Sequence, residues 1–161
     1  MDVSLCLIVR REDGKIRHVL LAMKKRGFGR GWWNGSGGKI EKNETVEQCA
    51  VRETGEEIGL TISESHLKKA GVIDFFFPSN PEWDQRMHVY LVGSWQGEPA
   101  ETEEMRPKWF RTEEVPYNEM WPTDAYWLPQ VLEGKMVTGS FTIGEDYQIF
   151  KNRIKEVKSL E

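Results

Sequence analysis

The chain has 161 residues, of which 39% are apolar and 30% are charged, a balance typical of one globular domain with a sizeable core. Its net charge of −4 argues against a protein that wraps polymeric nucleic acid, because such proteins present a strongly basic face. The longest apolar run, near residues 3–9, is far too short to cross a membrane. We therefore expect a single domain over residues 1–161 that neither spans a membrane nor binds polymeric nucleic acid.

Side chains that form disulfides or bind zinc are few and scattered. Cys6 and Cys49 lack CxxC spacing and no secretory segment is evident, so we expect reduced thiols in the cytoplasm. His18, His66 and His88 follow no metal-ligand spacing, which argues against a zinc site. We expect a cytoplasmic monomer.

The first predicted elements are strands over residues 3–9 and 18–23, joined by an Asp-Gly turn at residues 13–14. The second strand runs into MKKRGFGRG, where Lys24 begins a basic stretch interrupted by glycines. Ammonium groups on a flexible loop can neutralise a triphosphate, although the same residues also fit a solvated strand end. Asn34 follows in WWNG, where its amide could read the edge of a base or form a turn.

The stretch GKIEKNETVEQCAVRETGEEIGL, residues 38–60, is a glycine-led loop followed by a helix. It contains the Thr-x-x-Gln spacing of a capping box, and a glycine follows its last isoleucine, so we predict a helix over residues 45–58. Glu53, Glu56 and Glu57 are three and four positions apart and therefore share one face of that helix.

Like charges at those spacings repel, so the acidic face of this helix needs a partner. A divalent cation is the simplest partner, because Mg²⁺ prefers carboxylate oxygens together with waters and substrate phosphates. A solvated acidic face is the alternative. Gly35, Gly37 and Gly38 favour the metal, because their missing side chains let backbone groups approach a ligand or a cation.

Beyond this helix the pattern predicts a mixed sheet and a second helix. Alternation in residues 71–77 places Phe75 and Phe77 on one aromatic face. MWPTDAYW opens a helix over residues 120–133 that Pro129 is expected to kink or restart, and its aromatic residues fit a stacking surface or the core equally well. Further strands are expected at residues 87–95, 108–111, 137–143 and 147–150, and the charged tail, residues 152–161, is expected to fray.

One stretch resembles a known family signature. Gly38, then Glu44 after five residues, then RETGEEIGL from Arg52 after seven more resemble the Nudix box, a highly specific pattern. Thr54 departs from it, because an aliphatic residue is expected there, so we expect altered local packing and unchanged metal chemistry. From residue 19 to the terminal hairpin, the chain is similar to the MutT-homologue branch of the Nudix family in MKKRGFG, WNGSGGK, the box, EMRP followed by WF, and MWPTDAYW.

This resemblance implies an α/β (α+β) Nudix fold, with a mixed sheet sandwiched between helices. It also implies hydrolysis of oxidised purine nucleoside triphosphates, such as 8-oxo-dGTP, to the monophosphate and pyrophosphate. The nearest alternative is another diphosphate-linked substrate, such as a dinucleotide polyphosphate, a nucleotide sugar or a capped RNA. A nonhydrolytic module that binds nucleotide or RNA is a further alternative, since a fold does not fix its function.

The resemblance further implies the residues of the site. The ligands that it implies for Mg²⁺ or Mn²⁺ are Glu53, Glu56, Glu57, Glu104 and a backbone oxygen near Gly37 or Gly38. Arg52 and Glu44 are expected to orient the glutamates, and Glu56 or Glu104 to relay the proton of the attacking water. The substrate-binding residues that it implies are Lys24, Phe28, Asn34, Ser36, Gly37, Gly38, Lys39, Phe75, Phe77, Met105, Trp121, Thr123 and Asp124.

In that branch, two consecutive acids follow Trp-Pro and read the base. This chain departs from the pattern, because Thr123 and Asp124 follow its Trp-Pro. Two adjacent carboxylates can share one proton and read either a guanine-type or an adenine-type edge. Threonine cannot share a proton in this way. The pair therefore predicts a narrower enzyme that favours 8-oxoguanine over 2-hydroxyadenine triphosphates.

Overall fold

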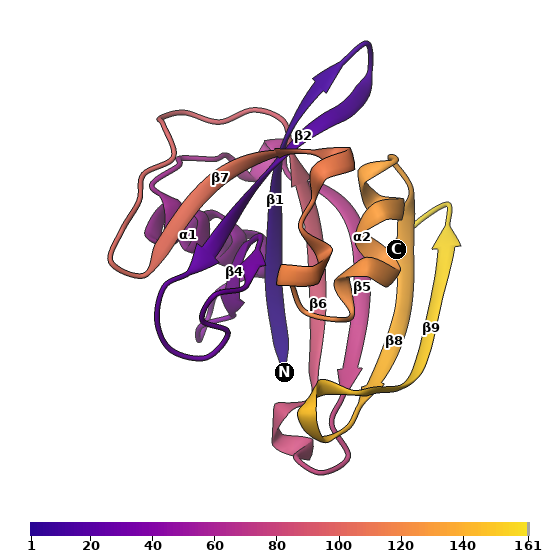
Figure 1. The fold of residues 1–161 in the computed structure, drawn as a ribbon. Helices are drawn as coiled ribbons and strands as arrows, with labels where there is room; N and C mark the ends of the chain where they lie inside the picture. The colour runs from indigo at the N-terminus through magenta and orange to yellow at the C-terminus, as the bar shows by residue number, and fades with distance from the viewer. Residues whose placement is uncertain (161) are drawn as a thin grey trace.

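The computed structural model describes residues 1–160, in which a nine-stranded sheet packs against two α-helices (Figure 1). The helices are α1 (Val46–Ile58) and α2 (Asp124–Leu132). The strands are β1 (Asp2–Glu12), β2 (Lys15–Lys24), β3 (Trp33–Asn34), β4 (Ser36–Lys39), β5 (Lys68–Phe76), β6 (Gln85–Val92), β7 (Met105–Arg111), β8 (Met136–Ile143) and β9 (Ile149–Val157). Short 3₁₀ helices lie at Glu64–His66, Pro81–Trp83, Thr112–Glu114, Tyr117–Glu119 and Glu145–Tyr147.

The sheet is mixed, as predicted. Its order is β3-β2-β1-β6-β5-β8-β9, with β4 also pairing with β1 and β7 with β2. β1 runs parallel to β6 and β5 runs parallel to β8, whereas the other pairs are antiparallel. Because β2 pairs only with the second half of β1, the first half is free to pair with the glycine-rich strand β4.

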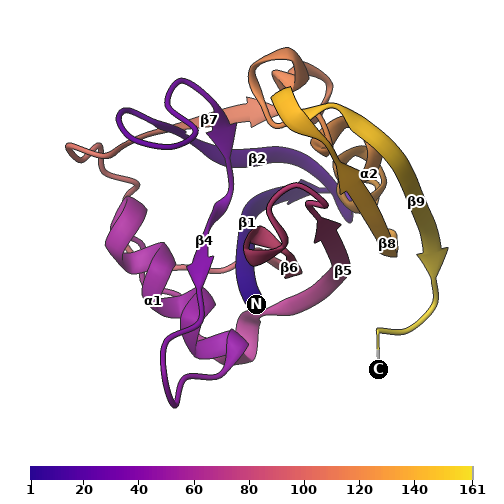
Figure 2. The ribbon, with the colours of Figure 1, turned by 90° about the horizontal axis from the view of Figure 1, so that it is seen from below.

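The two helices cover opposite faces of the sheet (Figure 2). Leu5 and Leu7 of β1 belong to the apolar cluster that contains Trp127 of α2, whereas Cys6 and Ile8 belong to the cluster that contains the apolar residues of α1. Successive side chains of a strand point to opposite faces, so β1 contributes to both halves of the core. The predicted sandwich is confirmed. None of the helices in residues 1–160 is long and apolar enough to cross a membrane.

Two local signals in the sequence are confirmed. Asp13 and Gly14 adopt φ angles of 52° and 76° between β1 and β2, the positive values that a tight hairpin turn requires. The Thr45 hydroxyl accepts from the Gln48 N–H at 3.1 Å, and the Gln48 side chain accepts from the Thr45 N–H at 2.9 Å, which completes the capping box. Gly59, at φ 74°, ends α1 in the left-handed conformation.

The C-terminal segment corrects the expectation that residues 152–161 fray. β9 begins at Ile149 and continues to Val157, paired with β8 along its length. Backbone hydrogen bonds therefore hold a segment in which four of nine side chains are charged. Charges such as Lys151 and Arg153 suit this edge strand, because they discourage pairing with another chain. Residue 161 lies outside the described residues.

Other boundaries differ from the predicted ones by a few residues. α2 begins at Asp124 instead of residue 120 and continues through Pro129, so the expected restart is wrong. The missing proline N–H removes one helical hydrogen bond without ending the helix. β7 begins at Met105 and includes Pro107, which is tolerated because β7 pairs with β2 alone and leaves its other edge open.

Thr54, the residue that departs from the box, is fully buried on α1. Its Oγ1 makes no hydrogen bond, so the helix buries a hydroxyl where an aliphatic side chain would pack. The hydroxyl does approach Cys6: burial raises the pKa of the Cys6 thiol to about 12, and proximity to Thr54 opposes that rise. Val51 and Ile58 pack in the same cluster as Cys6.

Replacing Thr54 with valine should stabilise the protein by about 1 kcal/mol, because a methyl group replaces a buried hydroxyl without a partner. Thermal unfolding should then show a Tm raised by about 2–4 °C. Thr54→Ser is the control: it keeps the hydroxyl, loses a methyl group and should lower Tm. A valine variant that is no more stable than the wild type would show that the folded protein satisfies this hydroxyl.

Candidate active site

Two glycines in β4 let this strand approach its neighbours closely. Gly37 lies opposite Leu5 and Gly38 lies opposite Ser4 in the pairing with β1. A Cβ added to Gly37 would overlap the Ser4 carbonyl oxygen, and one added to Gly38 would lie 2.5 Å from Glu53 Oε1. Neither position has room for a side chain, so the acidic face of α1 packs directly on the backbone of β4.

Glu57 is a half-buried acid of this face. The Gly37 N–H donates to its Oε1 at 3.4 Å. Burial raises the pKa of Glu57 to about 8, assisted by its hydrogen bond with Glu53 and by repulsion from that carboxylate, while the Gly37 N–H and the charge of Lys24 oppose the rise. In the metal-free protein this carboxyl group therefore keeps its proton to a higher pH than an ordinary glutamate does.

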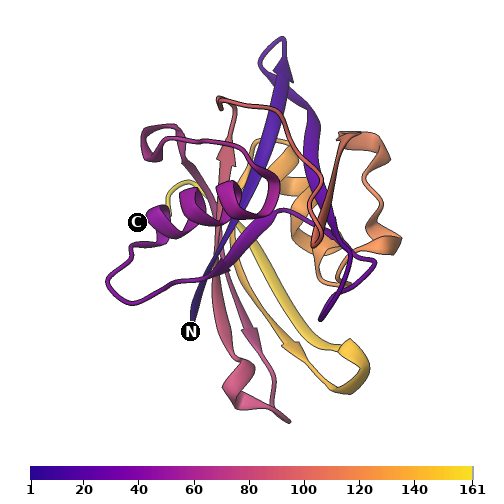
Figure 3. The same cartoon turned by 90° about the vertical axis from the view of Figure 1, so that its left-hand side faces the viewer.

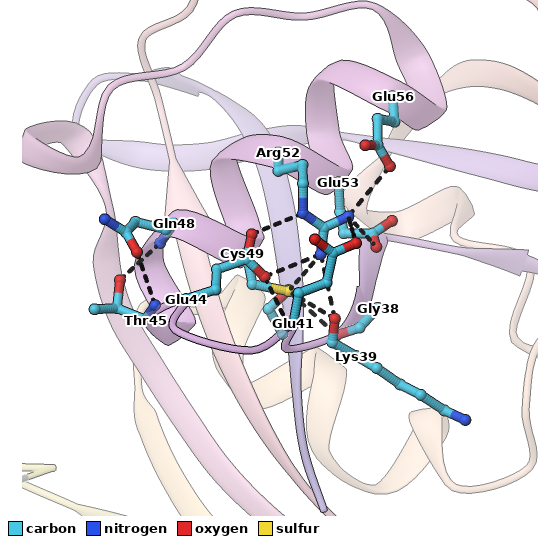
Figure 4. A network of polar contacts seen from close by, with 11 residues as sticks. Gly38, Lys39, Glu41, Glu44, Thr45, Gln48, Cys49, Arg52, Glu53 and Glu56 are labelled. Atoms are coloured by element: carbon cyan, nitrogen blue, oxygen red, sulfur yellow. Dashed lines mark hydrogen bonds and ion pairs between the residues drawn. The ribbon is translucent and has the colours of Figure 1, made fainter.

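Arg52 is the cation that balances the acidic face (Figure 4). Its Nε and Nη2 lie 2.7 and 3.0 Å from the two carboxylate oxygens of Glu44, and Nη2 also donates to the Lys39 carbonyl at 3.2 Å. Its Nη1 lies 2.9 Å from Glu53 Oε1 and 3.2 Å from Glu56 Oε2. The expected ion pairs of Arg52 and Glu44 are present, and the guanidinium lowers the pKa of Glu44 to about 2.

The donor set of this face fits a divalent cation. Glu53, Glu56 and Glu57 lie on neighbouring turns of α1 beside the backbone of β4, and hard cations prefer such oxygen ligands. A carboxyl group buried next to a carboxylate is also a position that added positive charge stabilises. In residues 1–160 no three His, Cys, Asp or Glu side chains are yet grouped so that they could hold a metal ion. The guanidinium described above instead contacts two of the three glutamates.

Glu104, expected as an additional metal ligand, is engaged with a different cation. Its carboxylate accepts from Arg26 Nη2 at 3.2 Å, and its carbonyl accepts from the Lys25 N–H at 2.8 Å. These bonds attach the loop before β7 to the loop after β2. Since Glu104 is not grouped with the glutamates of α1 in a metal-binding cluster, its role as a ligand stays a prediction.

Lys24 lies next to the glycine-rich loop that follows β2 and interacts electrostatically with the acidic face of α1. Cβ atoms added to Gly27 and Gly29 would lie 3.9 Å from its stem, so the loop after β2 covers this side chain. The Gly31 N–H donates to the Lys24 carbonyl at 2.8 Å and closes the loop. The charge of Lys24 also lowers the pKa of Glu57. Lys24 therefore lies between the glycine loop and the acidic face, where it can neutralise a phosphate chain.

The expected base-reading residues include two buried polar side chains, Thr123 and Asp124, each 5% exposed. Asp124 Oδ1 accepts from Trp127 Nε1 at 3.2 Å, but Oδ2 has no partner. Burial raises the pKa of Asp124 to about 7, so both its neutral and its ionised forms are accessible near neutral pH. Asn34 lies in β3 and not in a turn, so the turn-forming alternative is wrong, and its Oδ1 accepts from the N–H of the next residue, Gly35, at 2.9 Å.

The remaining predicted binding residues divide between the two faces of the sheet. Phe75 and Phe77 pack on the α2 side, whereas Met105 packs on the α1 side. In β4, Ser36 is buried and Lys39 is exposed. The structure thus brings Lys24 and the box residues together, and it distributes the expected base-contacting residues over several elements.

Two aromatic residues that the sequence did not indicate, Trp32 and Tyr147, contact Trp121, which is a predicted binding residue. The ring centroid of Trp121 lies 4.2 Å from that of Trp32 and 5.2 Å from that of Tyr147. Neither missed residue belongs to a periodic pattern, because Trp32 ends the glycine loop and Tyr147 lies in a turn. The only signal was the unusual number of tryptophans, seven in this chain. Trp127, from the same stretch as Trp121, is 1% exposed and belongs to the core.

Known proteins resemble this chain over most of its length. A sequence model of the NUDIX domain matches residues 2–131. An oxidized purine nucleoside triphosphate hydrolase from Mus musculus is 43% identical, over 89% of this chain and 90% of the relative, and one from Danio rerio is 44% identical, over 88% and 89%. The crystal structure of a mutator MutT protein from Bacillus halodurans has a TM-score of 0.80 and 25% identity, covering 96% of this chain and 97% of that one.

Glu57→Gln should stabilise the metal-free protein increasingly as the pH rises. The folded-state pKa of about 8 exceeds the unfolded value of about 4.3, so the carboxyl group is protonated in both states below about pH 4. Between those values only the unfolded chain loses the proton, and stability falls as pH rises. Glutamine has no such proton, so the Tm advantage of the variant, measured in chelator, should grow from about pH 5 to about pH 8.

Glu56→Gln is the matched control, because the Glu56 side chain is 60% exposed and lies on the same helix. Its Tm difference from the wild type should change little over this pH range. A difference for Glu57→Gln that stays constant with pH would contradict the assignment of a buried, protonated carboxyl group.

Proposed function

The chain belongs to the Nudix family, and we propose on that premise that it hydrolyses oxidised purine nucleoside triphosphates, such as 8-oxo-dGTP, to the monophosphate and pyrophosphate. Two relatives that align with most of the chain are oxidized purine nucleoside triphosphate hydrolases, which supports this substrate class. The biological role that follows is sanitation of the nucleotide pool, since a hydrolysed triphosphate is no longer available for incorporation.

One arrangement carries this proposal: the half-buried Glu57 beside Glu53, packed on the backbone of β4, with the charge of Lys24 acting on it. A partly buried acid that forms no ion pair with the protein is suited to a metal cation that arrives with the substrate. Lys24 adds a second positive charge, which the phosphates of the substrate can contact. Together they favour the binding of a metal polyphosphate.

Members of the family need a divalent metal, and here we take it to be Mg²⁺, with Mn²⁺ as a substitute. The residues that would hold it are Glu53, Glu56, Glu57 and a backbone oxygen at Gly37 or Gly38. When bound, such an ion neutralises the polyphosphate and lowers the pKa of an attacking water.

The neighbouring side chains have separate tasks. Arg52 fixes Glu44 and reaches Glu53 and Glu56, so it orients the acids and does not itself touch the substrate. The 60% exposed side chain of Glu56 is accessible to water, and we assign it the proton of the attacking water. Glu104, whose side chain is 63% exposed, is the alternative base.

At the end of the site that would hold the base, the side chains of Thr123 and Asp124 are both buried. Asp124 Oδ2 has no hydrogen-bond partner among the described residues. An ionised Asp124 would accept from N1 and N2 of a guanine-type base, while the Thr123 hydroxyl would donate to O6. Asn34 would contribute a further polar contact and Trp121 a stacking surface. Lys24 would neutralise the phosphates between the two ends.

We treat residues 1–161 as one catalytic domain, because β8 and β9, which lie beyond the family match, belong to the same sheet as β1. The buried free thiols of Cys6 and Cys49 support a location in the reducing cytoplasm. We further propose that the protein is a monomer.

With Mg²⁺ present, 8-oxo-dGTP should yield monophosphate and pyrophosphate in equal amounts. Glu56→Gln and Glu57→Gln should each lower kcat by at least about a hundredfold, because each variant removes a charge that the metal needs. Chromatography with separate phosphate and pyrophosphate assays measures both. Glu47→Gln, at the other end of α1, is the control and should retain kcat. Release of orthophosphate and diphosphate, or near wild-type turnover in both site variants, would contradict the proposal.

The wild type should also prefer 8-oxo-dGTP to 2-hydroxy-dATP by about tenfold to a hundredfold in kcat/KM, because an adenine-type edge leaves buried polar groups unpaired. Thr123→Asp should reduce this ratio, since two adjacent acids can share a proton and accept either base. Thr138→Asp, at a half-buried position of β8 outside the proposed site, is the control. A wild type that treats both substrates alike, or an unchanged ratio in Thr123→Asp, would show that this pair does not set base choice.

A further inference from the structure

Four aromatic rings meet beside the proposed base site, those of Phe28, Trp32, Trp121 and Tyr147, and we call them the aromatic tetrad. The ring centroid of Trp121 lies 4.2 Å from Trp32, 5.2 Å from Tyr147 and 5.3 Å from Phe28. The four residues come from three distant segments: the loop after β2, the segment before α2 and the turn between β8 and β9. That loop and that turn approach each other at one end of the molecule (Figure 3).

Trp121 contacts all three other rings of the tetrad. Trp32 and Tyr147 meet it nearly edge-on, with interplanar angles of 80° and 76°. Edge-to-face contact is a preferred geometry for aromatic pairs, so two such contacts resist rotation of the indole. Since Trp121 is only partly buried, its orientation depends on these neighbours more than on the core.

Tyr147 adopts a backbone conformation that tyrosine rarely takes. Its φ is 59°, and that of the preceding Asp146 is 57°. The left-handed region is unfavourable for a bulky residue and persists where surrounding contacts determine it. Those contacts are with the tetrad and with the core on the α2 side, against which Tyr147 is partly buried. The turn therefore presents this ring to Trp121 despite backbone strain that glycine would avoid.

Short contacts connect Trp121 to both ends of the proposed site. The Asp124 N–H donates to the Trp121 carbonyl at 2.9 Å, so a backbone hydrogen bond links the residue that carries the indole to the one that carries the base-reading acid. A Cβ added to Gly29 would lie 3.4 Å from the Trp121 ring and 3.9 Å from the stem of Lys24. Trp121 thus lies close to Asp124 on one side and to Gly29, which packs against the Lys24 stem, on the other.

We propose that Tyr147 is a positioning residue for purine binding, which together with Trp32 holds the Trp121 ring in the orientation that stacks on the base. This inference rests on the proposed function. Stacking needs a π-face and not a particular hydrogen-bond pattern, so Tyr147 serves every purine triphosphate and does not choose between oxidised bases. It also makes the β8–β9 hairpin, which lies beyond the family match at residues 2–131, part of the site.

The test compares kcat and KM in the wild type and in Tyr147→Ala, with 8-oxo-dGTP and 2-hydroxy-dATP as substrates. Loss of the ring should raise KM about tenfold for both substrates, equivalent to about 1.4 kcal/mol. It should leave kcat within about twofold, because the metal end of the site keeps its geometry. Tyr147→Phe keeps the ring and should restore KM to within about twofold of the wild type.

Phe150→Ala is the matched control, because Phe150 is 68% exposed on the same hairpin and makes no ring contact with the tetrad. Its KM should equal that of the wild type. An unchanged KM in Tyr147→Ala, an equal loss in Tyr147→Phe, or a fall in kcat at constant KM would overturn the inference. If Tyr147→Ala does not fold, Trp32→Leu removes the other edge contact and must raise KM in the same way, or the inference fails.

A wild type that does not hydrolyse 8-oxo-dGTP at all would contradict the proposed function and not the role of Tyr147. Calorimetric binding of 8-oxo-dGMP then decides the inference separately. The Kd should be about tenfold higher in Tyr147→Ala than in Tyr147→Phe, and equal values would overturn the assignment.

Discussion

The candidate site depends on the absence of side chains at Gly37 and Gly38. Because no Cβ intervenes, β4 pairs with β1 and at the same time receives the carboxylates of Glu53 and Glu57 on its backbone. Burial of those acids has an electrostatic cost, which the guanidinium of Arg52 partly offsets by contacting the exposed edge of the cluster. The innermost acid has no such partner and keeps its proton, which leaves a position that a divalent cation can complete.

The two ends of the site are built by different means. The acidic end is rigid, because it is built from a capped helix, a glycine-rich strand and an arginine that is hydrogen-bonded to Glu44, Glu53, Glu56 and the Lys39 carbonyl. The base end is assembled from segments that only tertiary structure brings together, and its order comes from ring contacts around Trp121. Lys24 belongs to both ends, since the glycine loop covers its stem while its charge faces Glu57. A substrate with an aromatic base and a charged chain matches this division.

Local signals explain which features the sequence could predict. The cap at Thr45, the left-handed end at Gly59 and the acidic spacing on α1 each depend on residues within one or two turns, and the structure contains all three. Contacts between distant segments carry no such signal. Nothing in the periodicity indicates that Tyr147 reaches Trp121, or that Glu104 contacts Arg26. β9 was missed as a long strand because backbone pairing with β8, and not an apolar pattern, holds its charged residues in place.

Proton release on Mg²⁺ binding tests the central claim most directly, namely that the buried acid of α1 is a metal ligand that keeps its proton until a cation arrives. Calorimetric titrations in buffers of different ionisation enthalpy measure this quantity. With the pKa of Glu57 at about 8, the account predicts release of about one proton per bound ion near pH 7 and almost none near pH 10. Mg²⁺ that binds near pH 7 without releasing a proton, or that does not bind at all, would contradict it.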